Sequence, residues 1–171
     1  FIDACMRSLN YNGWITFRMR AMLVSFASYN LWLDWRITGY HLAQTFTDYE
    51  PGIHYSKLQM QSGVTGINTV RVYNPIKQSY DHDPHGIFIK KWVPELKNIS
   101  KTWIHEPWKM ELSTQKTTKC IIGRNYPVPI VDHTISIKKA RARIAEIIKK
   151  DGYKDKSKVV LNKMGSRKRT K

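Results

Sequence analysis

The stretch GWITFRMR (residues 13–20) opens the segment that decides the fold. From Ile15 to about Tyr29 the residues are apolar over much of the helical circumference, which predicts a helix buried near the centre of a domain. Arg18 and Arg20 lie in this helix, and a guanidinium group is not buried without a counter-charge or an anionic ligand. We therefore expect an acidic group from elsewhere in the chain, or an anionic ligand, to meet these two side chains.

Two carboxylates, Asp48 and Glu50, follow in the segment Thr47–Tyr55, which contains a Pro-Gly pair and is predicted to be a loop. An arginine–carboxylate pair can hold a planar ligand whose edge presents both donors and acceptors. The alternative is a buried salt bridge with a purely structural role. The residues alone leave both interpretations open.

The remaining pattern of the front of the chain predicts helices joined by irregular loops. Residues 70–73 are expected to be extended up to Asn74-Pro75, and residues 81–86 to form a polar loop. No series of strands and no fixed-period repeat is present, so the expected class is all-α. The first of the other expected helices covers residues 2–9 and is closed by a turn at 10–13, and the next begins at Asp34 as N-cap. A third covers residues 56–63, before a turn between Gly63 and Gly66. The last covers residues 88–96, with a second short helix near Pro94.

Composition indicates a packed domain with a strong positive charge. The 171 residues are 42% hydrophobic, which excludes a wholly disordered chain, and 29 Lys and Arg against 13 Asp and Glu give a net charge of +16. A surplus of this size favours a polyanionic partner. The chain has no initiator Met and opens in apparent helix, so we expect a piece of a longer protein.

Most of this charge lies at the back of the chain. Residues 134–171 carry +11, which predicts a division into a domain at 1–133 and a basic extension at 134–171. Apolar residues at helical spacing between Ile137 and Ile148 predict an amphipathic helix that Gly152 ends, and residues 154–171 are expected to fray. Residues 166–171 (SRKRTK) are either a nuclear-import or nucleic-acid patch or a solvated tail.

Several other classes of site are not supported. His82 and His85, with Asp81 and Asp83, lack a nearby Cys or third His, so no metal site is predicted. No phosphate-loop, zinc-protease, hydrolase or dinucleotide fingerprint is present. No apolar run approaches the ~20 residues needed to span a bilayer, so we expect no membrane association and an intracellular protein, in the cytoplasm, the nucleoid or the nucleus.

Ordered blocks of residues resemble the photolyase/cryptochrome flavin-binding domain. The resemblance runs from Phe1 to about Arg143 and implies the all-helical C-terminal half of that domain, followed by a basic C-terminal extension. It also implies a divergent photolyase-like branch and a missing N-terminal part of the same protein as partner. The blocks are residues 3–9, 13–20, 34–36, 48–50, 73–75, 83–86 and 92–96, with residues 126–132 closing the domain.

The resemblance implies FAD as cofactor, and light-driven electron transfer from reduced FAD to a flipped pyrimidine dimer in DNA. Asp48 and Glu50, with Tyr49 between them, are then expected at the edge of the isoalloxazine ring, with Arg20 paired to Asp48. His54 matches the position that faces flavin N5, where it could tune protonation of the reduced ring. The alternative for His54 is packing or hydrogen bonding.

The same resemblance assigns residues toward DNA and toward the electron relay. Arg18 and Arg71 match basic positions that face DNA, where phosphate contacts give affinity without sequence specificity. Phe17 stands where relatives often have an Asn that helps hold flavin and lesion, and Met60 stands at a lesion-contacting Trp position. Trp35 matches the middle Trp of the relay, whereas Leu58 replaces the Trp nearest the flavin.

Three functions are weighed. The leading hypothesis is a deoxyribodipyrimidine photo-lyase, an FAD enzyme that binds damaged DNA and splits pyrimidine dimers in blue light. The second is a cryptochrome-type photoreceptor without repair activity, which Leu58 and Met60 favour. The third is a cofactor-free basic helical module that binds nucleic acid.

Overall fold

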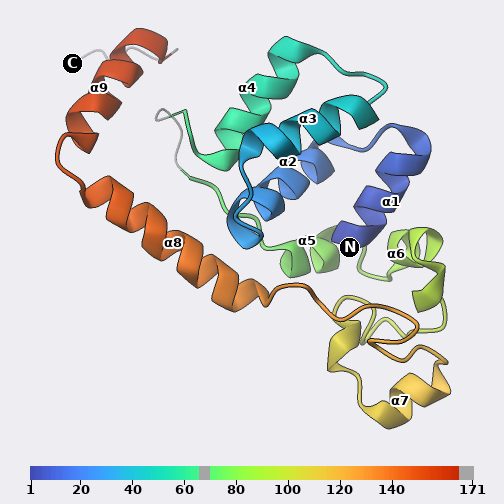
Figure 1. The fold of residues 1–171 in the computed structure, drawn as a ribbon. Helices are drawn as coiled ribbons and strands as arrows, with labels where there is room; N and C mark the ends of the chain where they lie inside the picture. Colours follow the sequence, from blue (N-terminus) through green and yellow to red (C-terminus); the bar gives the residue numbers. More distant parts are fainter. Residues whose placement is uncertain (66–69, 166–171) are drawn as a thin grey trace.

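The fold is a set of helices joined by loops (Figure 1), in a computed structural model that describes residues 1–65 and 70–165. The predicted all-α class is confirmed, since the one β-pairing in these residues is an isolated bridge between Ile122 and Tyr126. The α-helices are α1 Ile2–Asn12, α2 Phe17–Ser25, α3 Trp35–Thr45, α4 Pro51–Ser62, α5 Pro75–His82, α6 Ile87–Trp92, α7 Leu112–Thr117, α8 His133–Lys149 and α9 Tyr153–Met164, with a π-helix at Phe26–Asn30 and 3₁₀ turns at Pro94–Leu96 and Pro107–Lys109.

Helices α1 to α4 share one hydrophobic core. Its buried members come from all four helices and include Leu9, Met22, Leu42 and Leu58. Helix α1 is longer than predicted, because residues 10–12 stay helical and the turn begins only at Gly13, which adopts the left-handed conformation (φ 69°) and donates its N–H to the carbonyl of Leu9.

Helix α2 begins and ends differently from the helix predicted over Ile15–Tyr29. It begins at Phe17, because the Thr16 hydroxyl accepts a hydrogen bond from the N–H of Met19 and so caps the first turn. After Ser25 the helix widens into a π-turn, in which the N–H of Leu31 bonds to the carbonyl of Phe26.

The starts of α3 and α4 are set by acidic caps. Asp34 caps α3 as predicted, since its Oδ1 accepts from the N–H of Arg36. The predicted loop over residues 51–55 is wrong, because α4 already begins at Pro51 after a cap by Glu50. Proline fits the first helical position because its ring fixes φ and no N–H is needed there.

A second core lies under α6 and the loops that follow it. It contains Ile89, Val93, Ile99 and Ile104, all nearly inaccessible to solvent. Helix α6 begins at Ile87, and its first turn is fixed by the buried carboxylate of Asp83, which accepts from two backbone N–H groups.

Helix α5 was not predicted, because Asn74-Pro75 was interpreted only as the end of the extended stretch. In the structure the same two residues also start a helix. The side chain of Asn74 accepts from the N–H groups of Ile76 and Lys77, and Pro75 takes the first helical position. The end of the predicted polar loop is likewise helical, since α5 continues to His82.

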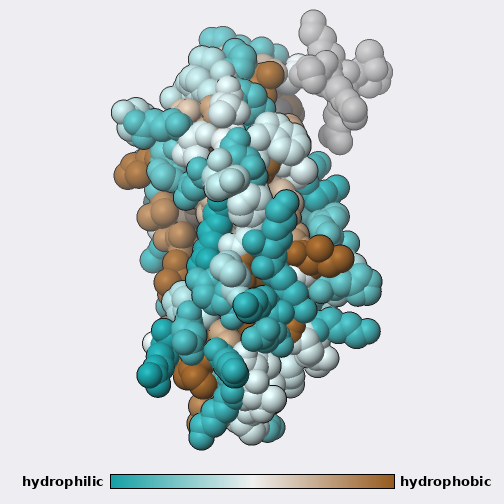
Figure 2. All heavy atoms as spheres, turned by 90° about the vertical axis from the view of Figure 1, so that its right-hand side faces the viewer, coloured by the Kyte–Doolittle hydropathy of each residue, from teal (hydrophilic) through white to brown (hydrophobic). Residues whose placement is uncertain are grey.

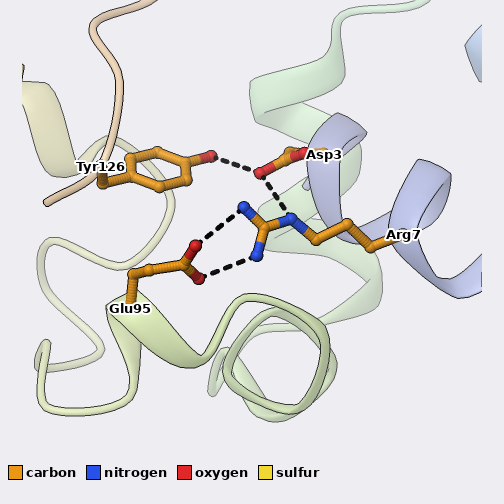
Figure 3. A network of polar contacts seen from close by, with 4 residues as sticks. All are labelled: Asp3, Arg7, Glu95 and Tyr126. Atoms are coloured by element: carbon orange, nitrogen blue, oxygen red, sulfur yellow. Dashed lines mark hydrogen bonds and ion pairs between the residues drawn. The ribbon is translucent and has the colours of Figure 1, made fainter.

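A polar network ties the second core to α1 (Figure 3). Arg7 donates to both carboxylate oxygens of Glu95, at 2.8 and 3.0 Å, and its Nε lies 3.3 Å from Asp3 Oδ2. The Tyr126 hydroxyl donates to the same Asp3 oxygen at 3.2 Å. The hydrogen bond from Arg7 is the main cause that lowers the pKa of Glu95 below its ordinary value.

We expect Glu95→Gln to reduce the acid sensitivity of the fold. Because the folded pKa of Glu95 is depressed, its contribution to stability is present above its unfolded pKa of about 4.3 and is lost as pH falls through the folded value. The loss of unfolding free energy between about pH 6 and about pH 3.5 is therefore smaller in the variant. Urea unfolding at both pH values measures it; an unchanged loss contradicts the prediction, and Glu111→Gln, at an exposed carboxylate, is the control.

Helices α8 and α9 run along the outside of the body formed by α1 to α5 (Figure 1). Ile137 and Ala140 of α8 pack against Tyr29 of the π-turn. The Nδ2 of Asn30 in the same turn lies 2.9 Å from both Ser136 Oγ and His133 Nδ1. The π-turn thus presents two neighbouring side chains to α8.

Two predictions about the back of the chain are wrong. Helix α8 ends at Lys149, before Gly152, which is left-handed (φ 78°) and precedes α9 instead. The predicted fraying is wrong for residues 154–164, because α9 covers them. Asp155 lies in the first turn of α9, where a carboxylate complements the helix dipole. The turn glycine Gly66 and the 166–171 patch lie outside the described residues. The division between residues 133 and 134 stays a prediction.

The face shown in Figure 2 is mostly hydrophilic, with hydrophobic side chains in several places, most of them along the left edge of the view. Large exposed apolar side chains include Ile37 and Tyr40 on α3 and Ile53 on α4. Among the helices of residues 1–65 and 70–165, none combines the length and the apolar character needed to cross a bilayer.

Candidate functional site

A cavity of about 300 Å³ lies between α2, α4 and the loop that joins α3 to α4. This volume is at the lower end of the range for ligand pockets, so the cavity suits one fused ring system rather than a whole dinucleotide. The wall is largely apolar, with a few charged groups. The lining residues are Trp14, Ile15, Phe17, Arg20, Val24, Leu42, Phe46, Asp48, Tyr49, Glu50, Ile53, His54, Lys57 and Leu58.

Arg20 is a largely buried charged side chain of the cavity, with 13% of its side chain exposed. Its Nε donates to the carbonyl of Ile15 at 3.0 Å, and its Nη2 donates to Asp48 Oδ2 at 2.8 Å. The guanidinium carbon lies 4.1 Å from the centre of the Phe46 ring, a cation–π contact. These contacts fix the orientation of the guanidinium group at the cavity wall.

Asp48 is the counter-charge that the sequence predicts for Arg20, and the predicted contact is present. The hydrogen bond from Arg20 is the main cause that lowers the pKa of Asp48 below its ordinary value, so this carboxylate stays ionised and accepts hydrogen bonds. Its side chain is 47% exposed, which leaves acceptor positions free to meet a ligand.

Glu50 lines the same cavity but is held by its own helix. Its Oε1 accepts from the N–H of Gly52 at 3.1 Å and its Oε2 from the N–H of Ile53 at 2.6 Å. The negative charge therefore complements the N-terminus of α4. Glu50 shapes the wall of the cavity by fixing where α4 begins.

His54 is buried against the cavity among aromatic rings. Its Nε2 lies 2.8 Å from the carbonyl oxygen of Gly39, and since a carbonyl only accepts, Nε2 carries the proton in this contact. The rings of Phe46, Tyr49 and Tyr55 meet it edge-on at 6.0, 5.3 and 5.2 Å between centres. His54 is thus held in one orientation by this hydrogen bond and the surrounding rings.

Lys57 is a lining residue that the sequence analysis missed. Its Nζ lies 3.5 Å from the centre of the Phe17 ring, which is itself 61% exposed. Lys57 follows His54 by three positions on α4, so both side chains share one helix face. The spacing places Lys57 beside His54 only if both belong to one helix. The predicted helix started at residue 56 and excluded His54, so this signal was missed.

Three of the residues predicted to face DNA lie away from this cavity. The prediction that Arg18 is buried beside Arg20 is wrong: Arg18 is exposed, and it borders a second cavity of about 380 Å³ that also touches Gln78 and His82. Met60 is half-buried outside both cavities, and Arg71 is exposed in the segment before α5. Their contacts with DNA stay predictions.

Trp35, the predicted relay residue, is the first residue of α3 and packs against the core shared by α1 to α4. It does not line the cavity, whereas Leu58 does and is only 1% exposed. An aliphatic side chain therefore occupies the inner wall where the resemblance places the nearest relay Trp.

The residues of the cavity fit the edge of an isoalloxazine ring, which presents both hydrogen-bond donors and acceptors. Arg20 supplies a donor fork and Asp48 an acceptor, side by side at 2.8 Å, and apolar walls are available to the ring faces. In the part of the chain that the structure describes, no group of three or more His, Cys, Asp or Glu is placed to hold a metal ion.

The comparisons with known proteins agree with this geometry. The family whose sequence model matches the chain is described as the FAD binding domain of DNA photolyase, and the match covers residues 1–146. The chain is 36% identical over 141 residues to a deoxyribodipyrimidine photo-lyase of Alkalihalophilus pseudofirmus, covering 81% of this chain and 29% of that protein. It is 33% identical over 147 residues to a cryptochrome DASH of Synechocystis, covering 85% of this chain and 30% of that protein.

Solved structures give the same pair of names. A class III photolyase from Agrobacterium tumefaciens superposes with a TM-score of 0.79 at 29% identity, covering 86% of this chain and 31% of that one. A Synechocystis cryptochrome superposes with a TM-score of 0.78 at 32% identity, covering 81% of this chain and 29% of that one. The chain therefore spans under a third of the length of these relatives.

Proposed function

The chain belongs to the photolyase/cryptochrome family, in its FAD-binding domain, and from that membership we propose that the protein is a light-driven DNA repair enzyme of the deoxyribodipyrimidine photo-lyase type. Its cofactor is FAD. The observation that carries the proposal is the Arg20–Asp48 pair at a ring-sized cavity, in a chain that matches this FAD-binding domain.

The chain's own residues hold and enclose the ring. Arg20 would donate to the polar edge of the ring and Asp48 would accept from it, while His54 would lie against the ring, since all three line the cavity. Apolar side chains such as Val24 and Leu42 exclude water from the inner wall. Bound and reduced FAD supplies blue-light absorption and the electron that splits the dimer.

DNA is the proposed substrate because the charge and the exposed cations suit a polyanion. The net charge is +16, and Arg18 and Arg71 are both exposed. Such cations supply affinity through phosphates, without reading sequence. The exposed ring of Phe17 at the mouth of the cavity offers a stacking surface to a flipped base, and Met60 is proposed to contact the lesion.

A cryptochrome-type photoreceptor is the second candidate, and Leu58 favours it. Its aliphatic side chain interrupts, at the cavity wall, the aromatic relay to which Trp35 is assigned. Some of the relatives are named photo-lyases and others are named cryptochromes, so family membership supports either role. A cofactor-free nucleic-acid module is disfavoured, since the cofactor of this domain is FAD.

The test is repair of an oligonucleotide that contains one thymine dimer, incubated with the complete protein carrying reduced FAD. We expect the dimer to disappear under blue light and to persist in the dark. The recovery of thymine absorbance measures its disappearance. Flavin photochemistry without loss of the dimer contradicts the repair proposal and supports the photoreceptor. Absence of bound flavin contradicts both.

A further inference from the structure

Lys57 stands out among the lining residues because the ion pairing of the cavity does not use it. It projects from α4 on the face shared by His54 and Leu58, and its ammonium rests on the Phe17 ring at 3.5 Å. Among the described residues, no carboxylate lies within ion-pair distance of its Nζ.

Each of the two carboxylates of the cavity already has a partner in the protein, although Asp48 keeps acceptor positions open to a ligand. Asp48 binds Arg20 at 2.8 Å, and both oxygens of Glu50 bind backbone N–H groups of α4. With Arg20 matched by Asp48 and Glu50 matched by the helix dipole, the charge of Lys57 is left without a compensating anion.

The pKa of Lys57 shows that the cavity disfavours the charge of its ammonium group. Burial is the main cause that lowers it from its ordinary value, and repulsion from Arg20 lowers it further, against the attraction of Asp48. An anionic group in the cavity would reverse this balance, because it attracts the ammonium in a partly dehydrated site where charges are weakly screened.

We propose that Lys57 stabilises the negative charge that the isoalloxazine ring carries when FAD is reduced, and thereby raises the reduction potential of the bound flavin. The inference rests on the proposed function, since it takes the flavin ring as the occupant of the cavity. A charge near the ring is one of the means by which a protein tunes a bound cofactor. Lys57 acts here as a positioning and tuning residue.

The test is the reduction potential of FAD bound to the complete protein, in wild type, Lys57→Met and Lys57→Arg. Methionine keeps the unbranched length and the helix propensity but removes the charge. We expect Lys57→Met to bind oxidised FAD within threefold of wild type and to lose about tenfold in the preference for reduced over oxidised FAD, which lowers a two-electron potential by about 30 mV. Lys57→Arg keeps the positive charge, so its preference for reduced over oxidised FAD is expected to stay within a factor of about two of the wild-type value.

The matched control is Lys116→Met, which removes the same charge from α7, at the far end of the fold from α4 (Figure 1), and leaves the potential unchanged. An unchanged potential in Lys57→Met, or an equal shift in the control, overturns the inference while the proposed function stands. A loss of DNA affinity in Lys57→Met with no change of potential assigns the side chain to a phosphate and also overturns it. A wild-type protein that binds no flavin overturns the proposed function together with this inference.

Discussion

Replacing Arg20 with methionine is expected to weaken FAD binding about 100-fold, or about 2.7 kcal/mol. The side chain is proposed to provide the charged donor at the ring edge, and a hydrogen bond to a charged group contributes about 1.5–3 kcal/mol. Its loss also leaves the carboxylate of Asp48 without its partner and the carbonyl of Ile15 without its donor. Fluorescence titration of the apoprotein with FAD measures the dissociation constant.

Arg36→Met is the matched control for this variant. Arg36 also contacts an aspartate, Asp34 at 3.5 Å, and also stacks on an aromatic ring, that of Trp35 at 4.8 Å. Its side chain is 71% exposed and lies outside the cavity, so FAD affinity is expected to stay within about twofold of wild type. Equal affinities in the two variants would refute the assignment of Arg20 to the flavin.

Replacing Gly86 with alanine is expected to lower the unfolding free energy by about 4 kcal/mol. Gly86 precedes α6 with φ at +67°, a conformation that costs an L-residue energy wherever it occurs. An added Cβ would also lie 2.6 and 2.8 Å from two carbons of Ile104, which is buried in the second core. Strain and overpacking therefore act together, and urea unfolding of the variant measures their sum.

Gly152→Ala separates these two causes. Gly152 also has a positive φ, +78°, but a Cβ there would meet nothing within 4 Å. Only the backbone strain remains, so the expected loss is about 1 kcal/mol. If both variants lost the same amount, overpacking against Ile104 would be ruled out as the larger contribution.

The helices that the sequence predicted well are those with a local start signal and a clear apolar stripe. Asp34 is such a signal, and α3 begins where it was predicted. Pro51-Gly52 and Asn74-Pro75 misled the prediction, because the residues that end a strand or form a turn also occupy the cap and first position of a helix. Which role applies depends on the packing of the following residues, and that is set by the tertiary structure.

The candidate site was predictable where charge dictated it. A guanidinium in an apolar helix requires a partner, which pointed to the acidic segment of Asp48 and Glu50, and the family resemblance then paired Arg20 with Asp48, 28 residues away. The same reasoning failed for Arg18, because residues two apart on a helix point to nearly opposite sides, so Arg18 faces solvent when Arg20 faces the cavity. The apolar content of the whole helix concealed this difference.

The cap that Glu50 places on α4 fixes the first turn of the helix that presents His54 and Lys57 to the cavity. His54 lies in the first turn of α4 and donates its N–H to the carbonyl of Glu50, so loss of the cap would fray the turn that directs His54 to the cavity. A carboxylate that needs no contact with the ring can in this way decide which atoms the ring meets. Substitutions at Glu50 would then alter the surroundings of the flavin indirectly, by loosening the first turn of α4.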